Sequence, residues 1–160
     1  MKILGIDPGS VITGYGLINA KDGVVKLIEA GIIKMRAADP LKDRIHTVYR
    51  NLNDVVVAHK PDVLVLEKLY THHSYRTTAS ILGHVRGVIC LLCAQKNIIL
   101  AESSVKRIRK AVTGNGGASK KQTQVMVAHL LSISEDKLTA DAGDALALAI
   151  GYISLNRKKI

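Results

Sequence analysis

The chain has 160 residues, 48% of them hydrophobic, which is enough to bury the core of one domain, so we expect a single domain over residues 1–160. We expect no membrane-spanning segment and no N-terminal leader, because the apolar runs look too short and the N-terminus lacks a basic region, and we therefore expect a cytoplasmic protein without membrane contact. Lys and Arg number 23 against 13 Asp and Glu, and the net charge of +10 favours a polyanionic partner, with nucleic acid the first candidate.

The N-terminal part of the sequence predicts three antiparallel strands. Residues 2–7, "KILGID", form a short apolar run that is stopped by a Pro-Gly pair. Residues 13–20 alternate as a second strand does, and the Asp-Gly pair that follows favours a tight hairpin into a third strand at 24–35. The chain therefore begins with a β-meander.

Helices and strands alternate in the rest of the sequence. A helix is predicted within residues 39–60, with Asp39 as its cap and a proline in its first turn, and an apolar strand follows at 62–67. The remaining expected elements are a helix at 78–96, a strand at 97–103, a helix at 105–112 capped by Ser103 or Ser104, and helices at 120–131 and 139–155. A meander followed by alternating helices and strands predicts an α/β fold of the ribonuclease H-like type, with a five-stranded mixed sheet and helices on both faces.

Four carboxylates stand at positions that favour chemistry. Asp7 and Glu67 each end an apolar strand, and the carboxyl edge of an open sheet is where ligands bind. Asp141 and Asp144 are three residues apart in the last helix, so they share one of its faces. Taken singly, each has a structural explanation, since Asp opens turns and suits the first turn of a helix. Together they predict one acidic cluster.

Such a cluster predicts a divalent metal site. Close carboxylates repel one another, so they need either cations or raised pKa values. Oxygen ligands without His or Cys indicate Mg²⁺ or Mn²⁺ rather than zinc. Two such ions about 3.5–4 Å apart activate water and stabilise the leaving oxygen of a phosphodiester. We therefore expect phosphodiester hydrolysis, and we expect Asp144→Asn to raise the melting temperature when metal is absent.

The predicted helix at 78–96 has two further features. Cys90 and Cys93 lie in an apolar pattern without a second Cys or His pair at ligand spacing, so core packing is expected for both. Ala79, Gly83 and Gly87 recur every four residues, at a cost of about 1 kcal/mol per glycine in helix propensity. This row allows close approach either of the protein's own sheet or of a second copy.

Four motifs resemble the RuvC family of Holliday junction resolvases. They are "GIDPGSxxTGYG" at 5–16, the acid that follows "VLVL", "HVRGV" at 84–88 and "DAGDALALAI" at 141–150, and they span nearly the whole chain in the family's order. The resemblance implies a homodimeric crossover junction endodeoxyribonuclease that nicks two strands of like polarity in four-way junction DNA during recombination and repair. It also implies two Mg²⁺ ions per active site, with Mn²⁺ as a substitute, and the RuvA–RuvB branch-migration complex as partner.

The resemblance assigns roles to individual residues. The implied catalytic and metal-binding acids are Asp7, Glu67, Asp141 and Asp144. The family's aromatic wedge corresponds to Tyr70, and its DNA-binding lysines correspond to Lys106 and Lys120, with Lys121 as a second candidate for the latter. Gly143 stands where alanine is commoner in the family.

Other interpretations stay open at this point. One is a ribonuclease H-like nuclease of other specificity, although "TGYG" and "VRGV" speak against it, and another is a protein that binds junctions without cutting them. A sugar kinase or actin-like protein would need two such lobes to close on ATP, and this chain has one. His72 and His73 are either solvated loop residues or contacts to DNA.

Overall fold

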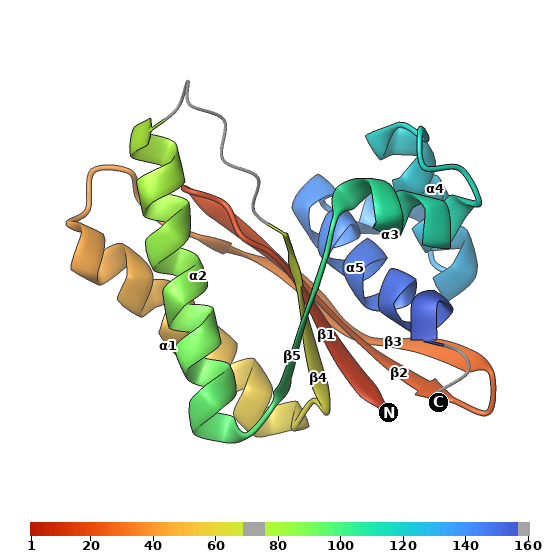
Figure 1. The fold of residues 1–160 in the computed structure, drawn as a ribbon, viewed down its shortest axis with the longest axis horizontal. Coiled ribbons are helices and arrows are strands. Elements are labelled where there is room, and N and C mark those ends of the chain that lie inside the picture. The colour runs from red at the N-terminus through yellow and green to blue at the C-terminus, as the bar shows by residue number, and fades with distance from the viewer. Residues whose placement is uncertain (69–75, 157–160) are drawn as a thin grey trace.

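A five-stranded mixed sheet with helices on both faces forms the centre of the molecule (Figure 1). The computed structural model describes residues 1–68 and 76–156. The order of the strands across the sheet is β3-β2-β1-β4-β5, so the first strand of the chain lies in the middle. The predicted fold class is confirmed.

The first three strands form the expected meander. Strands β1 (Lys2–Asp7), β2 (Ile12–Lys21) and β3 (Val24–Lys34) pair in antiparallel fashion. Asp22 and Gly23, both with positive φ, make the tight turn between β2 and β3. Strands β4 (Val63–Glu67) and β5 (Ile99–Ser103) run parallel to β1, so the carboxyl ends of these three strands meet at one edge of the sheet.

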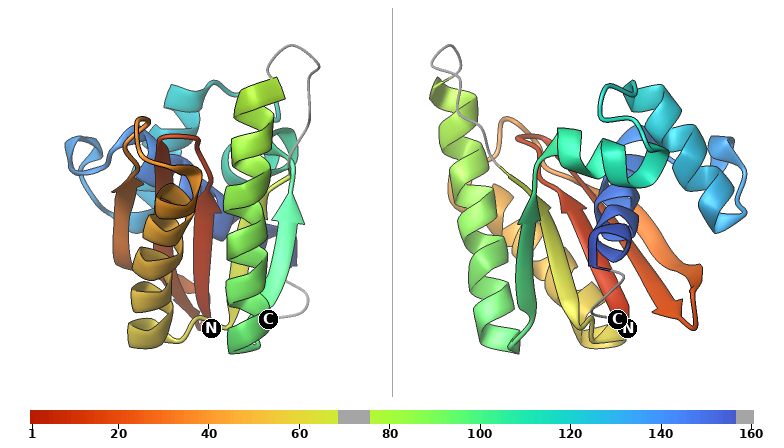
Figure 2. Two further views of the ribbon diagram at one scale, coloured as in Figure 1. Left: turned by 90° about the vertical axis from the view of Figure 1, so that its left-hand side faces the viewer. Right: turned by 45° about the vertical axis from the view of Figure 1, so that its right-hand side comes forward.

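Two groups of helices cover the sheet (Figures 1 and 2). Helices α1 (Leu41–His59) and α2 (Arg76–Lys96) lie on one face. The other face is covered by α3 (Val105–Thr113), α4 (Lys120–Leu131) and α5 (Ala140–Asn156), with a 3₁₀ turn η1 (Glu135–Lys137) between the last two. Because side chains alternate along a strand, Leu4 and Ile6 pack toward α1 and α2, whereas Ile3 packs toward α5.

The start of α1 differs from the sequence analysis, and the start of α3 agrees with one of its two alternatives. The prediction that Asp39 caps α1 is wrong, because Pro40 occupies the N-cap and Asp39, one residue further out, pairs with Arg36 at 3.6 Å. Ser104 caps α3, accepting a hydrogen bond from the Arg107 amide at 3.4 Å, and Ser103 ends β5.

Helix α5 lies directly on the sheet because glycines face it. A Cβ atom on Gly5 would overlap the carbonyl oxygen of Ala145, and a Cβ on Gly14 would overlap that of Asp141. Gly14 is the antiparallel partner of Asp7 at the end of β1. This close approach brings the start of α5 to the sheet edge where the acidic strands end.

Helix α2 exposes much of its apolar surface. Cβ atoms on Gly83 and Gly87 would meet nothing within 4 Å, so the row of small residues does not pack on the protein's own sheet. Cys93 is buried as expected, but Cys90 is exposed and the prediction that it packs in the core is wrong, because it lies on the outer face of the helix.

One helix bears on the expectation that no segment spans a membrane. The segment Thr78–Lys96 is long and apolar enough to span a membrane by length and composition, although only 22% of it is buried. One side of this helix packs on the sheet, where Val85, Ile89 and Leu92 are fully buried.

Candidate active site

Asp7 and Glu67 lie side by side at the carboxyl edge of the sheet. Ile6 of β1 and Leu66 of β4 are partners in the parallel ladder, so the next residue of each strand ends next to the other. Asp7 follows Ile3 by four residues and Glu67 follows Val65 by two, so both acids lie on the face of the sheet that these residues turn toward α5. Strand pairing and side-chain alternation together direct the two carboxylates to one face.

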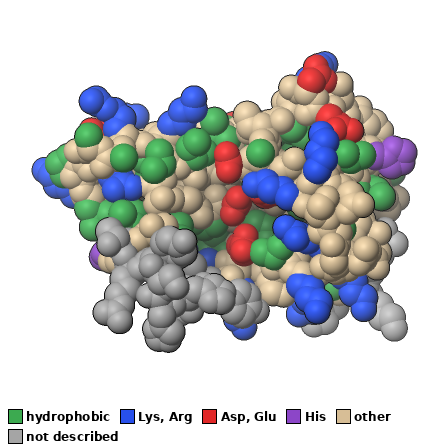
Figure 3. Space-filling view, turned by 90° about the horizontal axis from the view of Figure 1, so that it is seen from above, with side chains coloured by type: hydrophobic (Ala, Val, Ile, Leu, Met, Phe, Trp, Pro, Cys, Tyr) green, Lys and Arg blue, Asp and Glu red, His purple; other side chains and the backbone are tan. Residues whose placement is uncertain are grey.

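The two acids line a cavity of about 250 Å³ between the sheet edge and the three helices on that face. Asp144 of α5, Lys120 of α4 and Arg109 of α3 complete its charged lining. The remaining lining residues are Val105, Ile108, Thr123, Ala147 and Leu148. Seen from above, acidic side chains gather at the centre of this surface with Lys and Arg beside them (Figure 3).

Asp141 lies at the margin of this cluster. It is in the first turn of α5, and its backbone is in close contact with Gly14. It does not line the cavity, yet its charge raises the pKa of Asp7. Three of the four predicted acids therefore share the cavity, and the fourth lies near enough to act on them electrostatically.

Lys120 is held in the cavity by Asp144. Its Nζ lies 2.5 Å from Asp144 Oδ2, and this hydrogen bond raises the pKa of the lysine. Lys120 is the first residue of α4, directly after a capping box formed by Ser119 and Gln122, which fixes where the helix begins. The cap therefore places one cation among the acids.

The crowding of the acids appears in their pKa values. Burial, followed by the charges of Glu67 and Asp144, raises the pKa of Asp7 from 3.8 to about 7, and Lys120 opposes the rise. Burial and the charge of Asp144 also raise the pKa of Glu67, against the opposing charge of Arg109. Desolvation and mutual repulsion thus favour protonation of both strand-end acids, as the sequence predicted for at least one member of the cluster.

The chemistry of these side chains fits a divalent cation. The donors are carboxylate oxygens, which Mg²⁺ and Mn²⁺ prefer, and a cation would relieve the repulsion that raises the pKa of Asp7. Within residues 1–68 and 76–156, no three His, Cys, Asp or Glu side chains are already gathered at metal-binding spacing. One oxygen of Asp144 is bound by Lys120 instead. A cation bound at Asp144 Oδ2 would therefore compete with Lys120.

The candidate DNA contacts have different locations. Lys106 is exposed on α3, and Lys121 turns away from the acids to pair with Glu135 at 2.6 Å. Lys120, not its neighbour, therefore lies at the acidic cluster. Tyr70, and also His72 and His73, lie outside the described residues.

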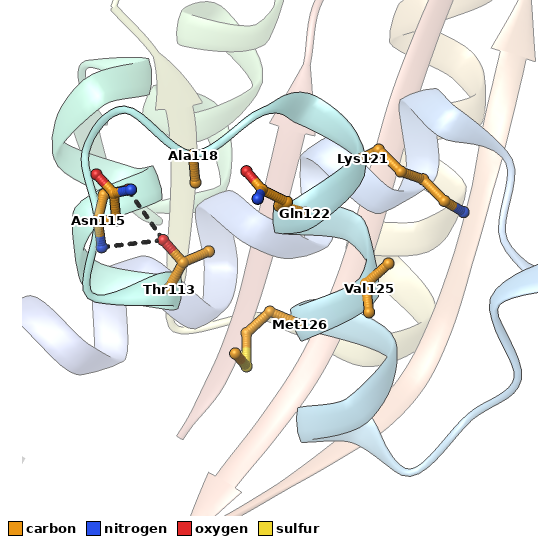
Figure 4. Close-up of a pocket in the computed structure, with 7 residues that line it drawn as sticks. All are labelled: Thr113, Asn115, Ala118, Lys121, Gln122, Val125 and Met126. Carbon is orange, nitrogen blue, oxygen red and sulfur yellow. Dashed lines mark hydrogen bonds between the residues drawn. The ribbon is translucent and has the colours of Figure 1, made fainter.

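A second cavity, of about 340 Å³, lies between the end of α3 and the start of α4 (Figure 4). Its polar groups already have partners in the loop: Asn115 Oδ1 accepts from the Gly117 amide at 2.9 Å, and Gln122 Oε1 accepts from the Ser119 amide at 2.8 Å. Lys121, Val125 and Met126 form part of its wall. These contacts shape the glycine-rich loop and the helix start that positions Lys120.

Sequence reasoning missed three arginines near the site. Arg109 lines the cavity, three residues after Lys106 on the basic helix, and this spacing was a usable signal. Arg86 of α2 donates to the Glu67 carbonyl oxygen, and Arg44 of α1 donates to that of Ser10, in the loop that follows Asp7. Only "HVRGV" drew attention to Arg86, and no local pattern marked Arg44.

Residues 3–152 match the family model of crossover junction endodeoxyribonuclease RuvC. The chain belongs to the RuvC family. Its relatives include crossover junction endodeoxyribonuclease RuvC of Rhodopirellula baltica, 38% identical over 92% of this chain and 83% of the relative, and that of Desulforamulus reducens, 39% identical over 94% and 91%.

Solved structures of Holliday junction resolvases share the fold. RuvC of Thermus thermophilus in complex with a Holliday junction substrate has a TM-score of 0.92 at 22% identity, covering 99% of this chain and 96% of that one. The yeast mitochondrial Holliday junction resolvase has a TM-score of 0.71 at 13% identity, covering 98% and 79%. At such low identity these matches establish the common architecture.

Proposed function

We propose that this protein is a crossover junction endodeoxyribonuclease that resolves four-way DNA junctions by paired nicks in strands of like polarity. Membership of the RuvC family supports the reaction class. The observation that carries the proposal is the convergence of Asp7, Glu67 and Asp144 from three separate elements on one cavity, flanked by Lys120 and Arg109. Phosphodiester hydrolysis needs acids that hold metal ions and cations that bind the phosphate, and both kinds of side chain line this cavity.

We assign the catalytic acids to Asp7, Glu67, Asp141 and Asp144. They would hold two Mg²⁺ ions, with Mn²⁺ as a substitute, and the bound ions would activate water and stabilise the leaving oxygen. The raised pKa of Asp7, about 7 without metal, makes this carboxyl able to hold a proton near neutral pH. Arg109 and Lys120, which line the same cavity, would neutralise the scissile phosphate.

The DNA backbone would run over the basic helix α3 beside the cavity. Lys106, Arg107 and Lys110 are exposed there, next to the cavity residue Arg109. The net charge of +10 supports such a polyanionic partner. Tyr70, just beyond Glu67 in the chain, remains our candidate for stacking on an unpaired base at the junction.

We propose that the outer face of α2 is the interface of a homodimer. Gly83 and Gly87 leave open space there, and Cys90 and Leu91 are exposed next to them. Leu100, on the edge strand β5 and on the face of the sheet that α2 covers, is 37% exposed and adds to this apolar surface. A two-fold dimer would present two cavities to the two strands that must be nicked. As in the family, we expect a cytoplasmic protein that acts with the RuvA–RuvB complex.

The proposal is tested by cleavage of a synthetic four-way junction with Mg²⁺, compared with duplex, RNA–DNA hybrid and single-stranded DNA of the same sequence. We expect paired nicks in the junction and little cutting of the other substrates. Asp7→Asn should bind the junction as the wild type does and cut less than about a hundredth as fast, because it loses a metal ligand but no cation. Preferential cutting of the hybrid would favour a ribonuclease H, and binding without any cutting would favour a junction-binding protein.

A further inference from the structure

Arg86 connects helix α2 to the end of the acid-bearing strand β4. Its side chain is only 14% exposed. One guanidinium nitrogen, Nη1, donates to the backbone carbonyl oxygen of Glu67, and the other, Nη2, donates to Glu102 Oε1 on β5. A single side chain from α2 thus holds two neighbouring strands where they end.

Arg86 contacts Glu67 at the point where the hydrogen-bonded pairing of the strands ends. Glu67 is the last residue of β4, and the next amide, that of Lys68, donates to the Ser103 carbonyl at 2.8 Å. Arg86 adds a second bond at the same point, from the opposite face of the sheet. Because the Glu67 carbonyl and its side chain share one Cα, fixing the first restricts the directions available to the second.

The pairing with Glu102 explains why a buried guanidinium is tolerated here. Glu102 faces α2, whereas its neighbour Ser103 aligns with Glu67 on the other side. The carboxylate of Glu102 neutralises Arg86 and holds its planar fork in place, so both donors are used with defined geometry. The positive charge also lowers the pKa of Glu67, in opposition to burial.

A similar contact is found at the other strand-end acid. Arg44 of α1, 8% exposed, donates to the carbonyl oxygen of Ser10 in the loop that follows Asp7. Both helices on the face opposite the cavity therefore send one arginine to the backbone beyond an acid-bearing strand. Each contact reaches the end of a strand from the face of the sheet opposite the cavity, so it does not occupy the cavity.

We infer that Arg86 is a positioning residue that aims the Glu67 carboxylate into the cavity and ties it to α2. The inference rests on the proposed function, which makes Glu67 a catalytic acid. Arg86 does not line the cavity or contact the reacting atoms. Its loss should impair metal binding and cleavage while leaving the basic DNA-binding surface of α3 unchanged.

The test uses Arg86→Met, Arg86→Lys and Glu102→Gln in the full chain, with Glu67→Gln as the reference. We expect Arg86→Met to bind the four-way junction within about threefold of wild type. We expect its single-turnover cleavage to be about 100-fold slower, since small misplacements of catalytic groups have effects of that size. Arg86→Lys should recover part of the rate, because one ammonium can reach only one of the two acceptors, and Glu102→Gln should show a smaller loss than Arg86→Met.

A second readout does not depend on cutting. Mn²⁺ should raise the melting temperature of Arg86→Met less than that of the wild type, because a misdirected Glu67 binds the ion less well. If Arg86→Met cuts at the wild-type rate and its melting temperature responds to Mn²⁺ as the wild type does, the inference is overturned. If Arg86→Met does not fold, the same two measurements on Glu102→Gln decide. Conversion of Arg86→Met to a monomer by light scattering would also overturn it, because Arg86 would then act at the dimer interface. Wild-type cutting by Glu67→Gln would instead contradict the proposed active site.

Discussion

Lys120 Nζ lies 2.5 Å from Asp144 Oδ2, so the first side chain of α4 is bound to the acid on α5 that faces the same cavity. The next residue, Lys121, points elsewhere and pairs with Glu135. Two adjacent lysines of the same helix turn therefore have different partners. Of the two, Lys120 alone lines the cavity with the acids, and this makes it our candidate for contact with the scissile phosphate.

We predict that Lys120→Gln reduces junction cleavage by at least about 100-fold, because the cavity loses a cation aimed at the reacting phosphate. Lys121→Gln is the matched control, and it should cut within about threefold of wild type. Single-turnover cleavage of a labelled junction measures both. Equal effects of the two substitutions would mean that Lys120 is no more than a general backbone contact.

Lys106 should contribute to DNA affinity in a salt-dependent way. We predict that Lys106→Gln weakens binding to junctions of every sequence and lowers the slope of log affinity against log salt by about 0.9, the value for one lost phosphate contact. Lys121→Gln should lower the slope less, because Glu135 already neutralises that lysine. Titrations that measure junction affinity from low to moderate salt, with Ca²⁺ in place of Mg²⁺, test this prediction. An unchanged slope for Lys106→Gln would show that this lysine does not contact DNA.

The raised pKa of Asp7 predicts how stability depends on pH when metal is absent. The folded protein binds more protons than the unfolded protein between pH 3.8 and about 7, so the free energy of unfolding falls as pH rises through this range. Asp7→Asn removes the titrating carboxyl and therefore this loss of stability at higher pH. In EDTA at pH 8 the variant should melt several degrees above wild type, since each kcal/mol corresponds to about 2–4 °C in a chain of this size.

Two comparisons make this prediction specific. Lowering the pH to 5 should narrow the difference between Asp7→Asn and wild type, and Mg²⁺ should raise the wild-type melting temperature more than that of the variant. From the sequence we expected Asp144→Asn to raise the melting temperature without metal. The structure transfers this expectation to Asp7→Asn, because Asp144 already has Lys120 as a partner. A lower melting temperature for Asp7→Asn in EDTA would show that Asp7 is satisfied by its surroundings.

The close packing of α5 on β1 predicts a severe effect of Gly5→Ala. The new methyl group would overlap the Ala145 carbonyl oxygen, which cannot move without shifting α5, so we expect a loss of about 1–3 kcal/mol or more. Gly143→Ala, in the helix against which Gly5 packs, is the control, and its methyl would lie 3.2 Å from Cγ of the flexible Gln124 side chain. It should be neutral or stabilise by up to about 1 kcal/mol. Denaturant unfolding of both variants measures the difference.

The outer face of α2 predicts the oligomeric state. Gly83→Leu fills space that is open in one chain, so it should convert a dimer to a monomer by light scattering and abolish paired nicking. Exposed Cys90 should give a covalent dimer with a short bis-maleimide, and Cys90→Ser should not, because Cys93 is buried. A dimeric Gly83→Leu protein together with no cross-linking would place the interface elsewhere.

Local sequence patterns were sufficient for the element order, the fold class and the strand-end positions of Asp7 and Glu67. Strand periodicity, turn residues and helix caps act over a few residues, so they can be recognised without tertiary contacts. The repulsion among the acids also followed from their number and placement, and it agrees with the raised pKa values of Asp7 and Glu67. Family motifs then connected these positions to a reaction.

The tertiary structure alone decided which side chains meet. Whether Lys120 or Lys121 joins the acids depends on the rotation of α4 against α5, and a difference of one residue turns a side chain by about a quarter of a turn. The contacts of Arg86 and Arg44 cross from a helix to the end of a strand far away in sequence. Their partners lie at least 16 residues away in sequence, so no local periodicity marks these arginines. The packing of helices against strands determines these arginine contacts, and this packing depends on residues from all parts of the chain.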